Sequence, residues 1–436
     1  MYIFQLVLWI CAIAACCYYL AACVAAFLWL ADARRQRALP AFTPPVTILK
    51  PLRGAEAESY ATLASFCRLD YPSYQIVFGV KDPRDAVIPI VEKLRADFPH
   101  CDIALVVNET VHGYNGKVSN LQNALPSAKH DVLLIADSDI RVAPDYLRRV
   151  VAPLQDPQVG MVTCLYRGIS AKTFGDLLEN IGLASLFAPE VLTARMLQGV
   201  KFALGAGVVM RRATLEAIGG FTAIADHLAD DYELGYRVAT QLRSVVSSVY
   251  EKNANGVVGQ VPNLPHNSEV ARAVGQVENL PHSALAVNPG KNRANLQVIL
   301  SDCVVDHVAN AATLGEMFQH QLRWMRAIRV SRPAGYVGLI VTYGTVTASL
   351  ALLVNGFSSW AWRLWFVTLA LRMLAAFVAG FVALRDRTLL KWFWLVLLRD
   401  VLAFVVWLLG FWGNEIEWRG VRMRVLRDGK LTPIKE

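Results

Sequence analysis

The stretch "LLIADSDIRV", residues 133–142, places a strand and two carboxylates side by side. The apolar run from Val132 to Ala136 is typical of a buried strand, and it stops at Asp137, followed by one serine and Asp139. Two carboxylates one residue apart offer hard oxygen ligands to a divalent ion such as Mg²⁺, which binds through one or two carboxylates plus substrate phosphates. The alternative is a loop that uses aspartate only as a turn residue.

Strand and helix patterns alternate on both sides of this stretch. The strand patterns are "PVTILKPL" (45–52), "YQIVFGVKD" (74–82) and "DIALVVN" (102–108), and the helix patterns are "DAVIPIVEKLRADF" (85–98) and "KVSNLQNAL" (117–125). Such alternation predicts an α/β domain with a mostly parallel sheet covered by helices, whose ligands bind beyond the carboxyl ends of the strands. Because Asp82, Asp137 and Asp139 all follow strands, we expect them to share one crevice.

The composition indicates that part of the chain lies in a membrane. Of the 436 residues 55 % are hydrophobic, and the mean hydropathy is +0.37. Residues 2–31 carry no charge, whereas a bilayer core needs only about 20 such residues as a helix. A signal peptide would have a shorter apolar core after a basic stretch, but here Arg34, Arg35 and Arg37 follow it. We therefore predict a transmembrane helix over residues 1–32, with the next segment in the cytoplasm.

Residues 334–412 contain three further apolar stretches, which are Ala334–Asn355, Trp365–Leu384 and Trp392–Trp412. Arg399 and Asp400 divide the last stretch, and a charged pair at mid-bilayer is costly unless it faces protein or water. The six arginines and lysines of residues 413–436 predict a basic cytoplasmic tail. Three full spans would place that tail outside, so we expect the charge-divided stretch to be interfacial or re-entrant.

Cysteines and net charge exclude some classes of function. The eight cysteines have no C-x-x-C spacing for a metal or redox site. The net charge of +8 comes largely from arginines beside apolar segments, which favours contact with anionic lipid headgroups. No basic run alternates with aromatic residues, so we expect no nucleic-acid partner.

Further motifs follow in an order that matches a known family. They are "ILKPLRG" (48–54), "VKDPRD" (80–85), "NGKVSNL" (115–121), "ADSDI" (136–140), "LADDYELG" (228–235) and "HQLRW" (320–324). With these motifs the chain resembles the inverting, GT-A-fold glycosyltransferases of family 2 type. The resemblance is greatest to the ceramide glucosyltransferase branch and its bacterial relatives associated with hopanoid biosynthesis. It covers roughly residues 1–430 with one interruption, and the ordered set is far more specific than any single motif.

The resemblance implies roles on the donor side. Asp82 would contact the nucleotide, and Lys117 and Asn120 lie in the donor-binding stretch. Asp137 would contact the ribose or the metal, and Asp139 would hold the metal, Mg²⁺ or Mn²⁺. The donor would be a UDP-sugar.

The resemblance also implies roles on the acceptor side. Asp231 matches the catalytic base, although without the family match Asp231 would indicate only an acidic first turn of a helix. Arg323 would contact the donor diphosphate, and Trp324 would contact the donor and form a wall of the acceptor site. His320 stands where the family has glutamine or arginine, either in the acceptor site or as a helix-surface histidine. For His307 a structural role is favoured over metal binding.

Two segments depart from simple helix and strand patterns. A polar stretch at 240–295 interrupts the family pattern, and it contains two imperfect copies, "GQVPNLPHNSEV" (259–270) and "GQVENLPHSALAV" (275–287). We expect an exposed, disordered loop without a catalytic role. The amphipathic stretch "FGDLLENIGLASLFAPEVLTARML" (174–197) is expected at the membrane surface, where it would admit a lipid.

The sequence thus predicts a cytoplasmic GT-A domain, Rossmann-like, over residues 43–330 of a multi-pass inner-membrane protein. It has one N-terminal and two or three C-terminal membrane helices. It would transfer glucose or N-acetylglucosamine from a UDP-sugar to the hydroxyl group of a membrane lipid, ceramide or a hopanoid polyol. The alternatives are a small processive polysaccharide synthase and a membrane protein that senses nucleotides without catalysis. Donor turnover separates the sensor from the enzymes, and product size separates lipid glycoside from polymer.

Overall fold

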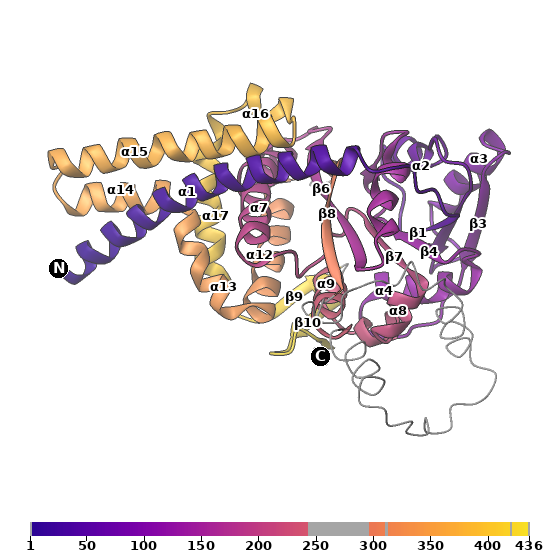
Figure 1. Cartoon of the computed structure of the whole chain (residues 1–436). Helices are drawn as coiled ribbons and strands as arrows, with labels where there is room; N and C mark the ends of the chain where they lie inside the picture. Colours follow the sequence, from indigo (N-terminus) through magenta and orange to yellow (C-terminus); the bar gives the residue numbers. More distant parts are fainter. Residues whose placement is uncertain (1, 243–295, 310–312, 419–420, 435–436) are drawn as a thin grey trace, which may run out of the picture.

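The computed structural model of the chain describes residues 2–242, 296–309, 313–418 and 421–434 (Figure 1). The disorder predicted for the polar stretch at 240–295 therefore concerns residues that lie almost entirely outside the described ones.

An eight-stranded sheet forms the centre of the predicted catalytic domain, with the strand order β3-β2-β1-β4-β7-β6-β8-β5. The strands are β1 (Val46–Leu52), β2 (Tyr74–Val80), β3 (Asp102–Val107), β4 (Val132–Ile135), β5 (Ile140–Arg141), β6 (Val159–Ile169), β7 (Val208–Arg211) and β8 (Gln297–Val308). Strands β1 to β4 pair in parallel, as do β6 and β8. Strand β7 is antiparallel to β4 and β6, and β5 is antiparallel to β8. The predicted mostly parallel α/β sheet is confirmed.

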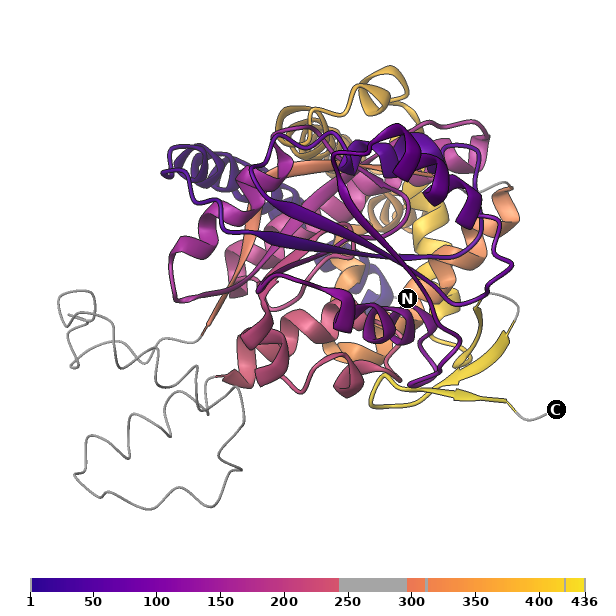
Figure 2. The same ribbon diagram turned by 90° about the vertical axis from the view of Figure 1, so that its right-hand side faces the viewer.

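Both faces of the sheet are buried, as the uninterrupted apolar strands require. In β4, Leu134 packs into one core, while Leu133 and Ile135 pack into the other. The first core is covered by α2 (Ser59–Phe66), α3 (Ile88–Asp97) and α5 (Tyr146–Val151). The second is covered by α4 (Gly116–Ala124), α8 (Arg212–Ala217) and α9 (Asp230–Thr240), which Figure 2 shows on the opposite side of the sheet.

The long helices α1 (Tyr2–Arg37), α14 (Gly344–Val354) and α15 (Ser359–Ala376) lie side by side and project away from the sheet (Figure 1). Three segments of the described chain are long and apolar enough to cross a membrane, namely Ile3–Arg37, Phe174–Gln198 and Ser359–Ala383. The pair Pro333–Thr342 and Gly344–Val354, bent by 63°, would make a fourth as a broken span. The N-terminal and C-terminal candidates agree with the predicted membrane helices.

The amphipathic stretch at 174–197 is more deeply buried than its sequence pattern predicts. It forms α6 (Phe174–Gly182), a π-helical turn (Leu183–Phe187) and α7 (Ala188–Gln198). Of its most apolar 18 residues, 83 % are buried inside the protein. The segment packs against α1, α12 (Leu314–Ser331) and α17 (Leu395–Gly410). These helices cover the apolar face that was expected to contact lipid, and the location of the segment at the membrane surface stays a prediction.

Helix α17 carries the charged pair that divides the last apolar stretch. The Asp400 carboxylate accepts hydrogen bonds from Arg372 of α15, at 2.7 and 2.8 Å, and from the Thr345 hydroxyl, at 2.9 Å. The Arg399 guanidinium donates to Oε1 of Gln321 in α12, at 2.7 Å. All these groups are buried between helices, which is how a charge becomes tolerable at membrane depth.

The predicted basic tail is folded. Its strands β9 (Glu415–Trp418), β10 (Val421–Val425) and β11 (Leu431–Pro433) form an antiparallel sheet. In β10 the apolar Met423 and Val425 are buried, and Arg422 and Arg424, which alternate with them, are exposed. The buried side packs on Leu228 and Val330, so the tail lies on the domain built around the eight-stranded sheet.

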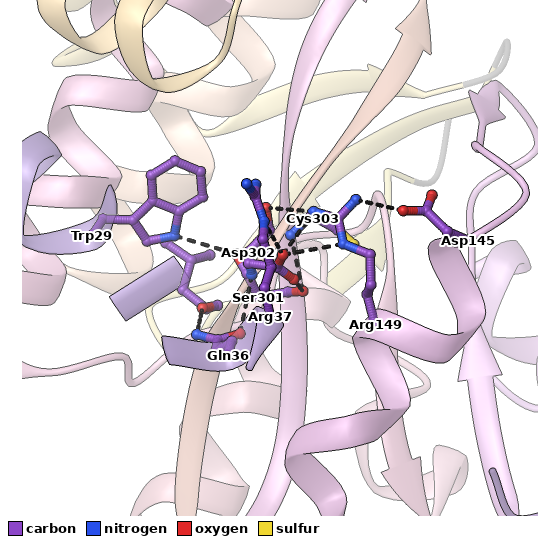
Figure 3. A network of polar contacts seen from close by, with 9 residues as sticks. Trp29, Gln36, Arg37, Asp145, Arg149, Ser301, Asp302 and Cys303 are labelled. Carbon is purple, nitrogen blue, oxygen red and sulfur yellow. Dashed lines mark hydrogen bonds and ion pairs between the residues drawn. The ribbon is translucent and has the colours of Figure 1, made fainter. Parts of the chain in front are cut away.

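The end of α1 is fixed to the sheet by polar contacts (Figure 3). The β6–β8 register shifts between Thr163 and Leu165, which takes residues 301–303 out of the regular ladder. Trp29 and Gln36 of α1 then donate to the carbonyl groups of Ser301 and Leu300, at 3.2 and 3.0 Å. The bulge therefore exposes backbone groups that the membrane helix satisfies.

The carboxylate of Asp302 completes this junction. It is almost fully buried and pairs with Arg37 at 2.9 Å and with Arg149 of α5 at 2.7 Å (Figure 3). A buried carboxylate depends on such partners, because transfer from water is costly. Helix α1 is thus a structural part of the domain.

We expect Arg149→Met to lower the free energy of unfolding by roughly 2–3 kcal/mol, because Asp302 loses a charged hydrogen-bond donor. The control is Arg148→Met, since Arg148 pairs with Asp70 at the surface, where such a pair contributes about 0–1 kcal/mol. Thermal unfolding of both variants in the same detergent measures the difference. Equal melting temperatures would show that the Asp302 cluster does not stabilise the junction.

Candidate active site

A cavity of about 430 Å³ lies at the carboxyl ends of the central strands, between the sheet and α12. Its lining includes all but one of the residues predicted for the site, together with His307 and Asp230: Lys117, Asn120, Asp137, Asp139, Asp230, Asp231, His307, His320, Arg323 and Trp324. They come from segments that are far apart in the sequence, so the fold brings the predicted constellation together.

Asp82 is the exception among the predicted residues. It lies in the turn after β2, where its carboxylate accepts a hydrogen bond from the backbone N–H of Arg84 at 2.8 Å. It is not among the residues that line the cavity. The expectation that it shares one crevice with Asp137 and Asp139 is not met, because its carboxylate stabilises its own turn. Its contact with nucleotide stays a prediction.

The turn between β4 and β5 presents Asp137 and Asp139 to the cavity. The strand ends at Ile135, and Ala136 is still bonded to Leu49 of β1. Lys50, the next residue of β1, donates from its ammonium group to the carbonyl oxygen of Asp137 at 2.7 Å. Burial lowers the pKa of Lys50 to about 7 although both aspartates oppose this. Lys50 lies in the motif "ILKPLRG" but is not among the predicted site residues, because a lysine inside an apolar strand does not by itself indicate what it contacts.

Asp137 and Asp231 approach each other across Gly205. A Cβ atom at position 205 would collide with Oδ2 of both aspartates. Only glycine lacks that atom, so the glycine of "LGAG" lets the end of β4 and the start of α9 meet. This contact joins the two acidic motifs into one site.

Lys117 holds three carboxylates together. Its ammonium group lies 2.8 Å from Asp137, 3.0 Å from Asp230 and 3.0 Å from Asp231. Asn115 caps α4 by accepting from the N–H groups of Lys117 and Val118, which aims the lysine at the cavity. Burial opposes the charge of Lys117, but the three carboxylates outweigh it and raise its pKa.

The protonation of Asp231 depends on the same cluster. Its withdrawal from bulk water and the neighbouring Asp230 raise the pKa of Asp231 well above its usual value, while Lys117 acts in the opposite direction. A carboxylate with a raised pKa is a better proton acceptor than an ordinary aspartate. Asp231 also lies in the first turn of α9 with Asp230 and Glu233, where the helix dipole favours negative charge. The acidic first turn of a helix and the residue that matches the catalytic base are therefore the same feature.

Asp139 pairs with His307 and keeps one oxygen free. The imidazole Nε2 of His307 lies 3.3 Å from Oδ2 of Asp139. Burial alone would raise the pKa of Asp139, but His307 outweighs it and the pKa is lowered. Burial likewise opposes the charge of His307, yet Asp139 raises its pKa to about 9. Oδ1 of Asp139 is buried and has no hydrogen-bond partner among the described residues.

That free oxygen fits a divalent ion. Among the described residues, no group of three histidine, cysteine, aspartate or glutamate side chains could hold a metal by itself. Mg²⁺ does not need one, because it is often bound by one or two carboxylates with the remaining ligands from substrate phosphates and water. Oδ1 of Asp139 and the neighbouring Asp137 would supply those carboxylates.

Asn120 has mainly a structural position. Its amide donates to the carbonyl groups of Gly79, at 2.8 Å, and Leu52, at 3.4 Å, and so joins the ends of β2 and β1. Asn120 is 8 % exposed and is part of the cavity lining. The predicted donor contact is thus available only to a small part of the side chain.

Aromatic side chains form another part of the lining. Ring centroids are 5.0 Å apart for Tyr166 and Phe187, 6.4 Å for Phe187 and Trp324, and 4.8 Å for Trp324 and His320. His320 also bonds through Nδ1 to the Glu179 carboxylate at 2.8 Å. The cavity therefore has a charged part and an aromatic part, suited to a diphosphate sugar and to an apolar molecule.

The folded tail supports the acidic helix start. The N–H of Leu228 donates to the carbonyl of Gly429 at 3.1 Å, and the N–H of Leu431 donates to the carbonyl of Asp226 at 2.7 Å. Asp226 and Leu228 lie just before Asp230 and Asp231 in the sequence. The last strand thus fixes the loop that leads into α9.

We expect truncation after Leu426 to lower kcat by about 100-fold, because displacement of a reacting group by about 1 Å has an effect of this size. The control removes only residues 434–436 and retains the backbone bonds of Gly429 and Leu431 to the loop before α9. Steady-state rates and melting temperatures of the two truncated chains test this. Equal rates would mean that the tail does not position α9.

The chain is similar to a known family and to curated glycosyltransferases. The family described as "Glycosyl transferase family 21" matches residues 7–257 and 290–431. Ceramide glucosyltransferase 1 of Caenorhabditis elegans is 27 % identical over 190 residues, 43 % of this chain and 41 % of that protein. Ceramide glucosyltransferase of Candida albicans is 35 % identical over 122 residues, 25 % of this chain and 22 % of that protein.

Two further similarities extend the comparison. Beta-monoglucosyldiacylglycerol synthase of Synechocystis is 25 % identical over 201 residues, 45 % of this chain and 40 % of that protein. These alignments span less than half the length of each curated relative. Among solved structures, the mannosyltransferase PcManGT from Pyrobaculum calidifontis, in complex with GDP-Man and Mn²⁺, is similar with a TM-score of 0.44 and 17 % identity, covering 92 % of this chain and 99 % of that one.

Proposed function

The chain belongs to glycosyl transferase family 21, and from this premise we propose that it is an inverting, membrane-bound glycosyltransferase acting on a lipid alcohol. It moves glucose or N-acetylglucosamine from a UDP-sugar to the hydroxyl group of the lipid. The observation that carries the proposal is the junction at Gly205, where the acidic turn after β4 meets the acidic start of α9. One cavity then holds groups for the leaving diphosphate and a base for the incoming hydroxyl.

The donor side is formed by Asp137, Asp139, Lys117 and Arg323, all in the cavity lining. Asp139, with Asp137, would hold Mg²⁺ or Mn²⁺, which would neutralise the negative charge that develops on UDP as the sugar leaves. Lys117 holds Asp137 and Asp231 in fixed positions, so these side chains need little reorganisation when the donor binds. Arg323 is placed to contact the diphosphate.

The acceptor side depends on Asp231. This carboxylate takes the proton from the lipid hydroxyl while the oxygen attacks the anomeric carbon. The roles divide between a base at the start of α9 and diphosphate-binding groups at the end of β4. A single displacement with inversion follows from one base on the face opposite the leaving group.

A lipid acceptor is supported by the surroundings of the cavity. The aromatic rings of Tyr166, Phe187 and Trp324 line it, and α12, which carries Trp324, continues at Pro333 into the first C-terminal membrane segment. Relatives named ceramide glucosyltransferase and beta-monoglucosyldiacylglycerol synthase favour a lipid with a free hydroxyl group. Ceramide and a hopanoid polyol are the acceptors proposed here.

The proposed location is the inner membrane with the catalytic domain in the cytoplasm. The arginines after the first span support it through the positive-inside rule. The folded tail lies on the catalytic domain, so both are on the same side of the membrane.

The test is to incubate the full-length protein, purified in lipid nanodiscs, with a panel of UDP-sugars and lipid extracts containing ceramides or hopanoid polyols. Mass spectrometry of the extracted lipids should show one hexose or N-acetylhexosamine added per lipid. The Asp231→Asn variant is the control for chemistry at the assigned base. A long polysaccharide product would support the processive synthase, and UDP-sugar binding without turnover would support the sensor.

A further inference from the structure

A buried carboxylate and a histidine form a pair beside the aromatic part of the cavity. Glu179 lies in α6 and is 3 % exposed, and its Oε1 is 2.8 Å from Nδ1 of His320 in α12. The side chain of His320 is 30 % exposed and lines the cavity. The pair thus connects a buried helix of the protein with the substrate space.

The chemistry of the two groups fixes the orientation of the imidazole. An ionised carboxylate only accepts hydrogen bonds, so Nδ1 of His320 must carry the donated proton. Trp324 lies one helical turn further along α12 and meets the ring edge-on, with centroids 4.8 Å apart. Glu179 and Trp324 therefore restrict both the tautomer and the tilt of the ring.

This orientation leaves Nε2 for a ligand in the cavity. In the neutral ring, Nε2 has the lone pair once Nδ1 carries the proton, and it accepts a hydrogen bond from a hydroxyl group. The neighbouring rings of Trp324 and Phe187 offer apolar surface to the same ligand. A hydroxyl group attached to an apolar body matches both features.

We propose that Glu179 is a positioning residue that orients His320, so that Nε2 of His320 binds the hydroxylated head of the lipid acceptor. The inference rests on the proposed function and adds a residue that no sequence motif contains. Glu179 acts only through His320, whereas Asp231 acts on the proton that is transferred.

The surrounding contacts hold the pair at the boundary between the domain and the membrane helices. Gln321, beside His320 in α12, accepts a hydrogen bond from Arg399 of α17 at 2.7 Å. A Cβ atom at Gly182, in the last turn of α6, would collide with the same guanidinium group. Helices α6, α12 and α17 therefore fix Glu179 and His320 relative to each other from two sides.

The test uses the full-length protein and compares KM for the lipid acceptor in three single variants. Glu179→Met keeps the length of the side chain and removes the hydrogen-bond acceptor, and it should raise the acceptor KM about tenfold, the size expected for one lost hydrogen bond. Glu179→Gln can still accept from Nδ1 and should stay close to the original protein. His320→Phe should raise the acceptor KM by as much as Glu179→Met.

A double variant separates positioning from a structural role. If Glu179 acts through His320, Glu179→Met should have no further effect in the His320→Phe background. KM for the UDP-sugar should be the same in the original protein, Glu179→Met, His320→Phe and the double variant, which distinguishes a local effect on the acceptor from a general loss of structure. An unchanged acceptor KM in Glu179→Met, or full additivity of the two substitutions, would overturn the inference. If the unmodified protein transfers no sugar to lipid, the proposed function fails instead, so the two failures can be told apart.

Discussion

Asp231→Asn is expected to lower kcat for sugar transfer by about 100- to 10,000-fold, the usual effect of removing a positioned general base. Asparagine keeps the size of aspartate, and its amide oxygen can still accept from Lys117, but it cannot take the acceptor proton. UDP-sugar affinity should change little, because donor binding in the ground state does not use the base. Initial rates and calorimetric titration with UDP measure the two quantities.

The matched control for this variant is Glu233→Gln. Glu233 lies in the same first turn of α9 and loses the same charge, but it pairs with Arg237 and is not among the residues that line the catalytic cavity. Its kcat should stay within about threefold of the original, because glutamine can still accept a hydrogen bond from Arg237 and neither side chain is in the cavity lining. Loss of UDP binding in Asp231→Asn with a normal kcat would mean that the base lies elsewhere.

Asp139→Asn is expected to lower activity by about 1,000-fold, equivalent to several kcal/mol of lost charge stabilisation on the diphosphate. Unlike Asp231→Asn, it should weaken UDP binding measured in the presence of Mn²⁺, since Oδ1 of Asp139 is the oxygen available to the ion. High concentrations of Mg²⁺ or Mn²⁺ should restore part of the activity.

The control for Asp139→Asn is Asp156→Asn, because the Asp156 carboxylate accepts from the N–H of Gln158 in a turn and is not among the residues that line the cavity. It should bind UDP and turn over normally. Full activity of the unmodified protein in EDTA would show that no divalent metal is needed. If Asp139→Asn kept its metal-dependent UDP affinity while Asp231→Asn lost it, the two assigned roles would be reversed.

The aspartates of the site could be predicted because each lies in a locally recognisable pattern. Asp137 and Asp139 end an apolar run, and Asp231 begins an amphipathic helix, so their sequence neighbours reveal their position. Their chemical roles came from the resemblance to a family. Lys50 and Glu179 are not among the predicted site residues, because Lys50 lies inside an apolar strand and Glu179 inside an amphipathic stretch, and neither position by itself indicates a partner.

The difference between local pattern and tertiary contact also explains the outcomes for the stretch at 174–197 and for Asp82. The stretch at 174–197 has the amphipathicity of a surface helix, and only the packing of α1, α12 and α17 shows that it is buried. Asp82 follows a strand as expected, yet its carboxylate turns back onto Arg84. Local sequence records which face of a segment is apolar, but not which partner covers that face.

The amino-acid pattern is sufficient to predict the long apolar helix at the N-terminus, the alternation of strands and helices, and the acidic turn at the end of β4. These features follow from hydropathy and from the periods of helix and strand, which act over a few neighbouring residues. Three arrangements arise only in the folded chain: Asp137, Asp230 and Asp231 share Lys117, Asp400 pairs with Arg372, and the tail supports α9. The physical reason is that a charge inside a protein is tolerable only next to a partner, and these partners are brought together by chain topology rather than by sequence distance.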